Sequence, residues 1–173
     1  MAVLRLRHLP IDHPDALSLV AGLQQEYRVR YGDEDSTPLD PREFDAPDGW
    51  FVVGYVAGEP VACGGWRARD DRDDPALRAG DAEIKRMFVA TEHRGRGYAR
   101  AVLAELERTA AAAGRRRAVL ESGTAQPEAM ALYPSAGYEP VPSFGHYRDS
   151  PNSRFFAKPL RGPGGPTAAS AAQ

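Results

Sequence analysis

Apolar and polar residues alternate along several short stretches of the chain, and each stretch predicts a β-strand. Two of these stretches, residues 51–56 and 61–66, lie close together and predict a hairpin. We expect its tight turn at Gly58-Glu59, because glycine suits the first position of such a turn. The full set of predicted strands is residues 3–7, 51–56, 61–66, 82–89, 118–121, 138–141 and 154–158.

Other stretches carry apolar residues at the three- and four-residue spacing of one helix face. A first helix is predicted directly after Asp12-His13-Pro14, because Asp or His can cap a helix and Pro suits its first turn. A second helix is predicted with its apolar face on residues 99–110 and Gly114 as its end, and a third from Pro127 to Gly137. Residues 31–49 are predicted to be loop with at most a short helix, and residues 67–80 to be a mobile loop. This order of elements predicts an α/β domain.

Composition narrows the class of protein further. The chain has 173 residues and a formal net charge of −2, which fits one domain with a real core. It has no apolar run of membrane-spanning length. Because the net charge is close to neutral and slightly negative, neither a nucleic acid nor a membrane is an expected partner. Its single cysteine, Cys63, cannot form an internal disulfide, and the start of the chain lacks an apolar signal segment, so we expect a cytoplasmic protein. We expect residues 1–160 to form the domain and residues 161–173, which have no large apolar side chain, to be a disordered tail.

The segment with the clearest chemistry is residues 89–99, where a strand ends, a glycine-containing loop follows and a helix begins. This arrangement points unpaired N–H groups and the positive end of a helix dipole at one place, which suits a pyrophosphate. Gly95 and Gly97 let the backbone approach the phosphates, and Arg94 and Arg96 add positive charge. The segment lacks the Gly-Lys-Ser/Thr ending of a Walker loop and the third glycine of a dinucleotide fingerprint.

Residues 94–99, Arg-Gly-Arg-Gly-Tyr-Ala, resemble the Arg/Gln-x-x-Gly-x-Gly/Ala signature of the GNAT N-acetyltransferases. Residues 83–89 resemble the fourth strand of that family, and residues 120–138 resemble its fifth strand, the following helix and its Leu-Tyr…Gly-Tyr ending. The resemblance implies a single GNAT-like domain with a central twisted, mixed but mostly antiparallel sheet of about six to seven strands and about four helices. It also implies a bacterial N-acetyltransferase of the small-molecule type, with acetyl-CoA as co-substrate.

The same resemblance implies where acetyl-CoA binds. The pantetheine arm is expected along the strand end formed by Met87, Phe88 and Val89. The pyrophosphate is expected on the loop and first helical turn formed by Arg94, Gly95, Arg96, Gly97, Tyr98 and Ala99. Gln126 stands where many members have an asparagine that contacts the cofactor arm.

The transfer reaction needs a base, because most alkyl amines are protonated at neutral pH and a protonated amine cannot attack a thioester. Glu83 matches the base that well-studied relatives carry on the fourth strand, and Glu121 is the alternative carboxylate. An ion pair with Lys85, which shares its strand face, is an equally open interpretation of Glu83. Tyr133 matches the family's general acid for the leaving thiolate, although an aromatic residue on a short helix is more often part of a core.

The acceptor site is less well defined by the sequence. The resemblance implies one wall from the first helix and the loop after it, and another from the loop before the last strand; the candidate residues are Tyr27, Tyr31, Lys85, Glu121 and His146. The acidic run Asp33-Glu34-Asp35 favours a cationic amine or is simply a solvated loop, whereas Lys85 or Arg86 could hold a carboxylate. We rank a small amino-acid-like amine first, a polyamine or aminoglycoside second, and a protein N-terminus or lysine third.

The sequence also allows functions other than catalysis. A catalytically inactive acyl-CoA-binding sensor of the same fold is the main alternative. A nucleic-acid binder is disfavoured by the acidic balance of the chain. The four histidines show no metal-ligand spacing, so no metal is expected. Many relatives dimerise, which makes a homodimer possible.

Overall fold

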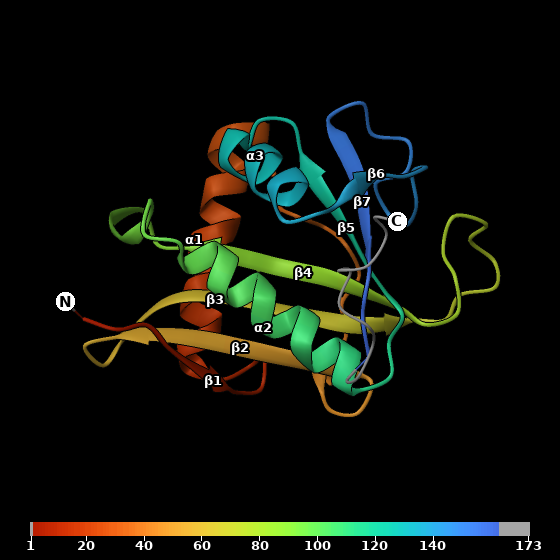
Figure 1. Ribbon diagram of the computed structural model, residues 1–173. Coiled ribbons are helices and arrows are strands. Elements are labelled where there is room, and N and C mark those ends of the chain that lie inside the picture. The colour runs from red at the N-terminus through yellow and green to blue at the C-terminus, as the bar shows by residue number, and fades with distance from the viewer. Residues whose placement is uncertain (1, 163–173) are drawn as a thin grey trace, which may run out of the picture.

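Seven strands form one sheet in the computed structural model, which describes residues 2–162 (Figure 1). In spatial order the sheet reads β1-β2-β3-β4-β5-β7-β6. Only β4 and β5 run parallel, and every other neighbouring pair is antiparallel. This arrangement confirms the predicted mixed, mostly antiparallel α/β fold. The strands are β1 (Arg5–His8), β2 (Gly49–Val56), β3 (Glu59–Arg69), β4 (Asp81–Val89), β5 (Arg117–Gly123), β6 (Glu139–Pro140) and β7 (Ser153–Pro159).

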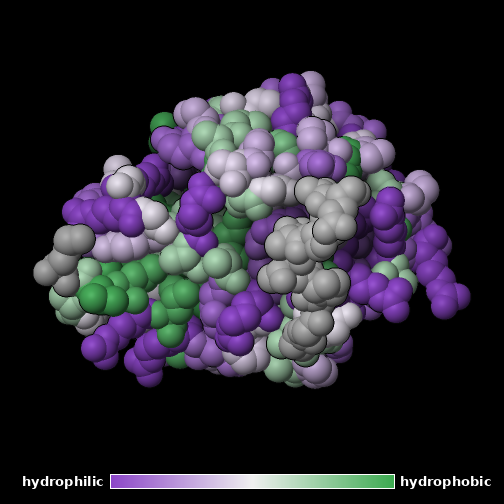
Figure 2. Space-filling view, viewed as in Figure 1, coloured by the Kyte–Doolittle hydropathy of each residue, from purple (hydrophilic) through white to green (hydrophobic). Residues whose placement is uncertain are grey.

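Helices cover both faces of the sheet: α2 crosses the near face in Figure 1, and α1 lies behind it. The α-helices are α1 (Pro14–Tyr31), α2 (Tyr98–Ala112) and α3 (Pro127–Ser135), and two short 3-10 helices are η1 (Pro41–Phe44) and η2 (Thr91–His93). The described residues therefore hold three α-helices, slightly fewer than the expected four. Along its edges the near face is mostly hydrophilic, with apolar residues gathered toward the left of the view (Figure 2).

The first helix begins where the sequence predicts and ends at a glycine. Nδ1 of His13 accepts a hydrogen bond from the backbone N–H of Asp15 at 3.1 Å, and Pro14 takes the first helical position. Gly32 ends the helix with a left-handed φ of 82°. These two caps fix the length of α1 and so fix where its last residue, Tyr31, stands.

The core consists of two apolar layers, one on each side of the sheet. On one side α2 packs Val102, Leu103 and Leu106 against strands β2 and β3. There the indole Nε1 of Trp66 donates a 3.0 Å hydrogen bond to Oγ1 of Thr109, which satisfies both buried polar groups. On the other side α1 and η1 pack over Phe51, Val53 and Cys63, and burial raises the pKa of the Cys63 thiol to about 12.

Two local predictions need correction. The hairpin turn is Ala57-Gly58 rather than Gly58-Glu59: Val56 pairs with Glu59, and both turn residues have positive φ, 51° and 84°. The segment predicted as a loop over residues 67–80 begins as strand, because β3 continues to Arg69. The positive charges at the end of β3 are matched by Glu83 on the neighbouring strand, so they do not end the strand.

A bulge in β4 opens the sheet. The parallel pairing of β4 with β5 covers only Asp81, Ala82 and Glu83. Further along, the register with β3 shifts and Arg86 adopts a left-handed φ of 60°. Gly64 of β3 lies beneath this bulge, where a Cβ atom would come within 2.6 Å of the Met87 sulfur. The two parallel strands therefore separate after three paired residues, and residues of both strands line a cavity beyond that point.

Among residues 2–162, no helix is long and apolar enough to cross a membrane. Within the same range, no group of three or more His, Cys, Asp or Glu side chains is arranged to hold a metal ion. Residues 163–173 of the predicted tail lie outside the described residues.

Candidate active site

Two adjoining cavities lie where β4 and β5 part. The larger, of about 520 Å³, lies between the start of α2 and α3 and is called the groove. The smaller, of about 240 Å³, lies beside the loop after α1 and is called the pocket. Three residues line both cavities: Met87, Gln126 and Tyr133. The two cavities therefore share part of their wall at these three side chains.

The groove is built around the N-terminus of α2. Gly97 caps this helix with a φ of 80° and offers no side-chain acceptor. The first helical hydrogen bond is donated by Ala101 to the Gly97 carbonyl, so the N–H groups of residues 98–100 have no helical acceptor. A Cβ atom at Gly95 or Gly97 would meet nothing within 4 Å, which shows that the loop borders open space. This arrangement of free N–H groups beside a cavity fits a diphosphate.

Arg94 fixes the loop in place rather than pointing freely into the groove. Its Nε donates to the Val89 carbonyl at 3.0 Å, and its guanidinium pairs with Glu26 of α1. Arg96 is exposed, bonds weakly to the Glu92 carbonyl at 3.4 Å, and does not line the groove. The other residues predicted to bind the cofactor do line it: Met87, Phe88, Val89, Arg94, Gly95, Gly97, Tyr98, Ala99 and Gln126.

The end of α1 is tied across the gap to the loop after β5. The Tyr31 hydroxyl accepts hydrogen bonds from the Ala125 N–H at 3.1 Å and from Nε2 of Gln126 at 3.4 Å. Arg30 donates to the Ala125 carbonyl at 2.7 Å. Because Gln126 lines both cavities, these bonds form part of the wall where groove and pocket meet.

Tyr133 lies at this junction. Its side chain is buried, and its ring packs edge-on to Tyr138 with centroids 5.7 Å apart. Among residues 2–162 its hydroxyl has no hydrogen-bond partner, so it is available to a ligand. Burial, and secondarily the charge of Glu121, raise the pKa of Tyr133 well above its usual value. The hydroxyl is therefore protonated at neutral pH and can donate a hydrogen bond or a proton.

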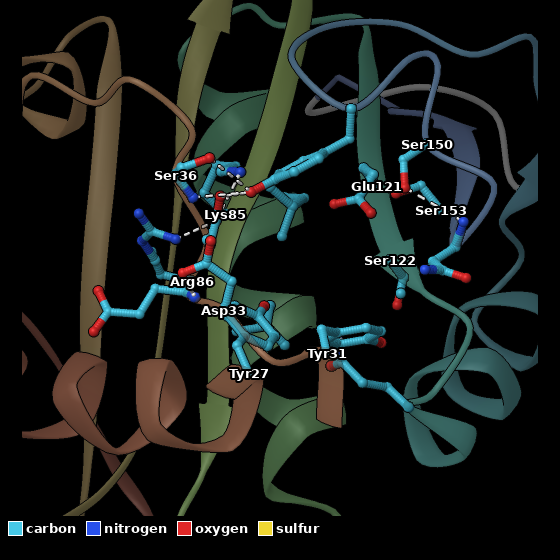
Figure 3. A pocket seen from close by; sticks show the side chains of 18 of the residues that line it. Tyr27, Tyr31, Asp33, Ser36, Lys85, Arg86, Glu121, Ser122, Ser150 and Ser153 are labelled. Atoms are coloured by element: carbon cyan, nitrogen blue, oxygen red, sulfur yellow. Dashed lines mark hydrogen bonds and ion pairs between the residues drawn. The ribbon is translucent and has the colours of Figure 1, made fainter. Parts of the chain in front are cut away.

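Glu121 projects from β5 into the pocket and faces Lys85 and Arg86 of β4 across it (Figure 3). Burial raises the pKa of Glu121, while the Ser153 hydroxyl and the charge of Lys85 partly offset this rise. A carboxylate with a raised pKa in a cavity is a candidate proton acceptor.

Glu83 lies outside both cavities. Its Oε2 accepts hydrogen bonds from Nε of Arg67 at 3.0 Å and Nη1 of Arg69 at 2.6 Å, and its side chain is 6% exposed. Burial alone would raise the pKa of Glu83, but Lys85, Arg67 and Arg69 together lower it. The sequence suggested Lys85 as its ion-pair partner; the direct partners are the two arginines of β3.

Asp35 connects three parts of the pocket wall. Its carboxylate pairs with Arg86 and lies 3.3 Å from Nζ of Lys85, both on β4. It also accepts from the Thr37 hydroxyl at 2.5 Å and from the Tyr147 hydroxyl at 3.1 Å. One carboxylate thus holds together the loop after α1, the bulge of β4 and the loop before β7.

The Acetyltransferase (GNAT) family model matches residues 17–138, which include β4, the α2 loop, β5 and α3. This chain belongs to the GNAT acetyltransferase family. It is 35% identical over 144 residues to the "IAA acetyltransferase" of Azospirillum brasilense, which covers 83% of this chain and 90% of that protein. It is also 36% identical over 88 residues to human N-acetyltransferase 8, covering 51% of this chain but only 34% of the human protein.

Solved structures of GNAT proteins have the same fold. A Klebsiella pneumoniae protein assigned to the acyl-CoA N-acyltransferases matches with a TM-score of 0.74 and 26% identity, over 92% of this chain and 99% of that one. A GNAT-family acetyltransferase from Staphylococcus aureus matches with a TM-score of 0.71 and 15% identity, over 92% and 100% of the two chains. Both structures cover more than nine-tenths of this chain, which shows that the fold is shared across the whole domain.

Four of the five residues predicted for the acceptor site of this GNAT protein line the pocket: Tyr27, Tyr31, Lys85 and Glu121. His146 does not line it; its Nε2 lies 3.1 Å from the Ser36 hydroxyl at the exposed edge. Its neighbour Tyr147 lines the pocket instead. Sequence reasoning missed the connecting role of Asp35, because the run Asp33-Glu34-Asp35 resembles an ordinary solvated loop.

Proposed function

We propose that this protein transfers an acetyl group from acetyl-CoA to the primary amine of a small molecule. The observation that carries the proposal is the junction of the two cavities. The groove offers free N–H groups to a diphosphate, the pocket holds a carboxylate, and the two meet at Met87, Gln126 and Tyr133. Transfer between two bound molecules requires this kind of contact between their sites.

The groove residues would hold acetyl-CoA along its length. The first turn of α2, with Gly95 and Gly97 before it, would bind the pyrophosphate through backbone N–H groups. The end of β4, Met87 to Val89, would lie along the pantetheine arm, since this part of the strand has parted from β5. Bound acetyl-CoA supplies an activated thioester, with a carbonyl carbon open to attack and a thiolate leaving group.

Glu121 is the proposed base. It lines the pocket, and its raised pKa suits it to accept a proton from the acceptor's ammonium group, directly or through water. Glu83 lies outside the pocket, and two arginines donate hydrogen bonds to its carboxylate. A carboxylate stabilised in this way holds a proton poorly, so Glu83 has a structural role in this proposal.

Tyr133 is the proposed acid. Its hydroxyl is protonated, has no partner among residues 2–162, and lies where groove and pocket meet. As the amine nitrogen bonds to the acetyl carbon and the carbon–sulfur bond breaks, negative charge develops on sulfur. The Tyr133 hydroxyl can donate its proton to that sulfur, which leaves as the free thiol. The attacking nitrogen loses its second proton as the amide forms, and that proton, passed through water, restores the Tyr133 hydroxyl.

The direct test is release of free thiol from acetyl-CoA in the presence of a panel of primary amines, beside calorimetric titration with acetyl-CoA. We expect saturable binding and amine-dependent thiol release. No binding by the folded protein would overturn the proposal at the groove. Binding without thiol release across amines, amino acids and peptides would instead indicate the inactive acyl-CoA sensor.

A further inference from the structure

The positive charges in the pocket are already paired. Among the described residues that line it, Lys85 and Arg86 are the only basic ones. Four acidic residues line the same pocket: Asp33, Glu34, Asp35 and Glu121. Glu34 pairs with Arg28 outside the pocket, and the remaining three acidic side chains still outnumber the two basic ones. The net charge of the lining is therefore negative, and an anion that enters needs a cation that is not already paired.

Asp35 forms ion pairs with both of these cations. It pairs with Arg86 and lies 3.3 Å from Nζ of Lys85. The three side chains are 9%, 7% and 9% exposed for Asp35, Arg86 and Lys85, so little of either cation is open to a ligand. Such a buried group of opposite charges is costly to disrupt, because one partner would remain buried without compensation.

The loop holds Asp35 in this position through further bonds. Oδ1 accepts from the Thr37 N–H at 2.9 Å, the Thr37 hydroxyl at 2.5 Å and the Tyr147 hydroxyl at 3.1 Å. The Asp35 N–H in turn donates to Oε1 of Gln24 on α1 at 2.9 Å. A substrate carboxylate would have to displace a side chain that three separate elements hold in place.

We propose that Asp35 acts as an internal carboxylate that fills the cationic site of the pocket, so that the enzyme selects amines that carry no carboxylate. This inference rests on the proposed function and makes it more specific. It reverses the ranking from sequence, in which Lys85 or Arg86 made an amino-acid-like acceptor the first choice. The remaining carboxylate, Glu121, faces the open space and favours an ammonium group there.

The test compares an amino acid with the amine that it becomes when its carboxylate is removed: phenylalanine with phenethylamine, and lysine with 1,5-diaminopentane. In the unaltered protein we expect kcat/KM for the amine to exceed that for its amino acid by about 10- to 100-fold, the range of a lost charged contact. Asp35→Asn frees Lys85 and Arg86, so the ratio should fall at least about tenfold. Asp45→Asn, an exposed change of the same charge outside the pocket, should leave the ratio unchanged.

Two further variants keep the test decisive. Thr37→Val removes a bond to Asp35 but keeps its charge, so the ratio should stay high even if overall activity falls. Lys85→Met should not selectively reduce activity on the amino acid, because Lys85 serves Asp35 rather than the substrate. Better activity of the unaltered protein on the amino acid, an unchanged ratio in a folded Asp35→Asn variant, or selective loss of amino-acid activity in Lys85→Met would each overturn the inference. No thiol release with any substrate would instead count against the proposed function itself.

Discussion

Gly123 lies directly beneath the hydroxyl of Tyr31, so close that a Cβ atom at position 123 would overlap that oxygen. Gly123→Ala should therefore displace Tyr31 and release its bonds to the loop at Ala125, at a cost of about 1–3 kcal/mol in the free energy of unfolding. If this overlap is the cause, the double variant Gly123→Ala/Tyr31→Ala should be no less stable than Tyr31→Ala alone. Additive losses in chemical denaturation would contradict it.

The two candidate bases predict opposite behaviour. Glu121→Gln should reduce kcat by about 10²–10⁴-fold, the usual contribution of a general base, with little change in acetyl-CoA affinity. Glu83→Gln should lower the stability by about 3–5 kcal/mol, because it leaves buried arginines without their carboxylate, while kcat per folded molecule is retained. Steady-state kinetics and urea unfolding of both variants separate the roles. The reverse pattern would restore Glu83 as the base.

Removing the Tyr133 hydroxyl should affect turnover rather than binding. Tyr133→Phe keeps the ring packing and should lower kcat by about 10²-fold or more, with acetyl-CoA affinity nearly unchanged. Tyr138→Phe is the matched control, because its ring packs against that of Tyr133 while the residue lines neither cavity. Equal losses in the two variants would assign the effect to packing.

Gly97 and Gly114 provide a matched pair for the groove. Both adopt a left-handed φ, 80° and 83°, and at neither would a Cβ atom meet a neighbour within 4 Å. Gly97→Val and Gly114→Val should therefore cost similar backbone strain, about 1–2 kcal/mol. Only the Gly97 variant places a side chain in the groove, so calorimetry should show loss of acetyl-CoA binding in that variant alone. Loss of binding in both would point to general destabilisation.

The pH dependence of turnover should follow Glu121. Burial raises its pKa, partly offset by Ser153 and Lys85, so the carboxylate gains its proton at a higher pH than an ordinary glutamate. Turnover should fall as pH decreases through this raised value, because the protonated acid cannot accept a proton. The same shift means that ionised Glu121 lowers stability at neutral pH, so Glu121→Gln should unfold at the same or a higher urea concentration. A kcat that is independent of pH on the acid side would exclude Glu121 as the base.

Elements whose signals are local were predictable from the sequence. The cap of α1 at His13-Pro14, the glycine before α2 and the alternation in β2 and β3 each act within a few residues. The turn at Ala57-Gly58 was misplaced because alanine rarely adopts a left-handed φ. Here the pairing of Val56 with Glu59 determines the turn, and the alanine takes that conformation.

The candidate site depended on distant contacts that the sequence does not display. The sequence placed Glu83 on its strand but did not identify its partners. The two arginines that donate to its carboxylate lie on β3, in a segment whose charged residues resemble a loop. Asp35 meets Arg86 across 51 positions and Tyr147 across 112. No local pattern predicts such pairs, since they depend on how the loops close over the sheet.

Because β4 and β5 part early, the two cavities are lined by different segments of the chain. The groove is framed by the turn before α2 and by α3, whereas the loops after α1 and before β7 close the pocket over β4 and β5. Changes in the pocket loops can alter which molecule is modified while the donor-binding half stays intact. New acceptor preferences are therefore open to loop exchange between relatives, with Asp35 as the residue through which a transplanted loop must be anchored to β4.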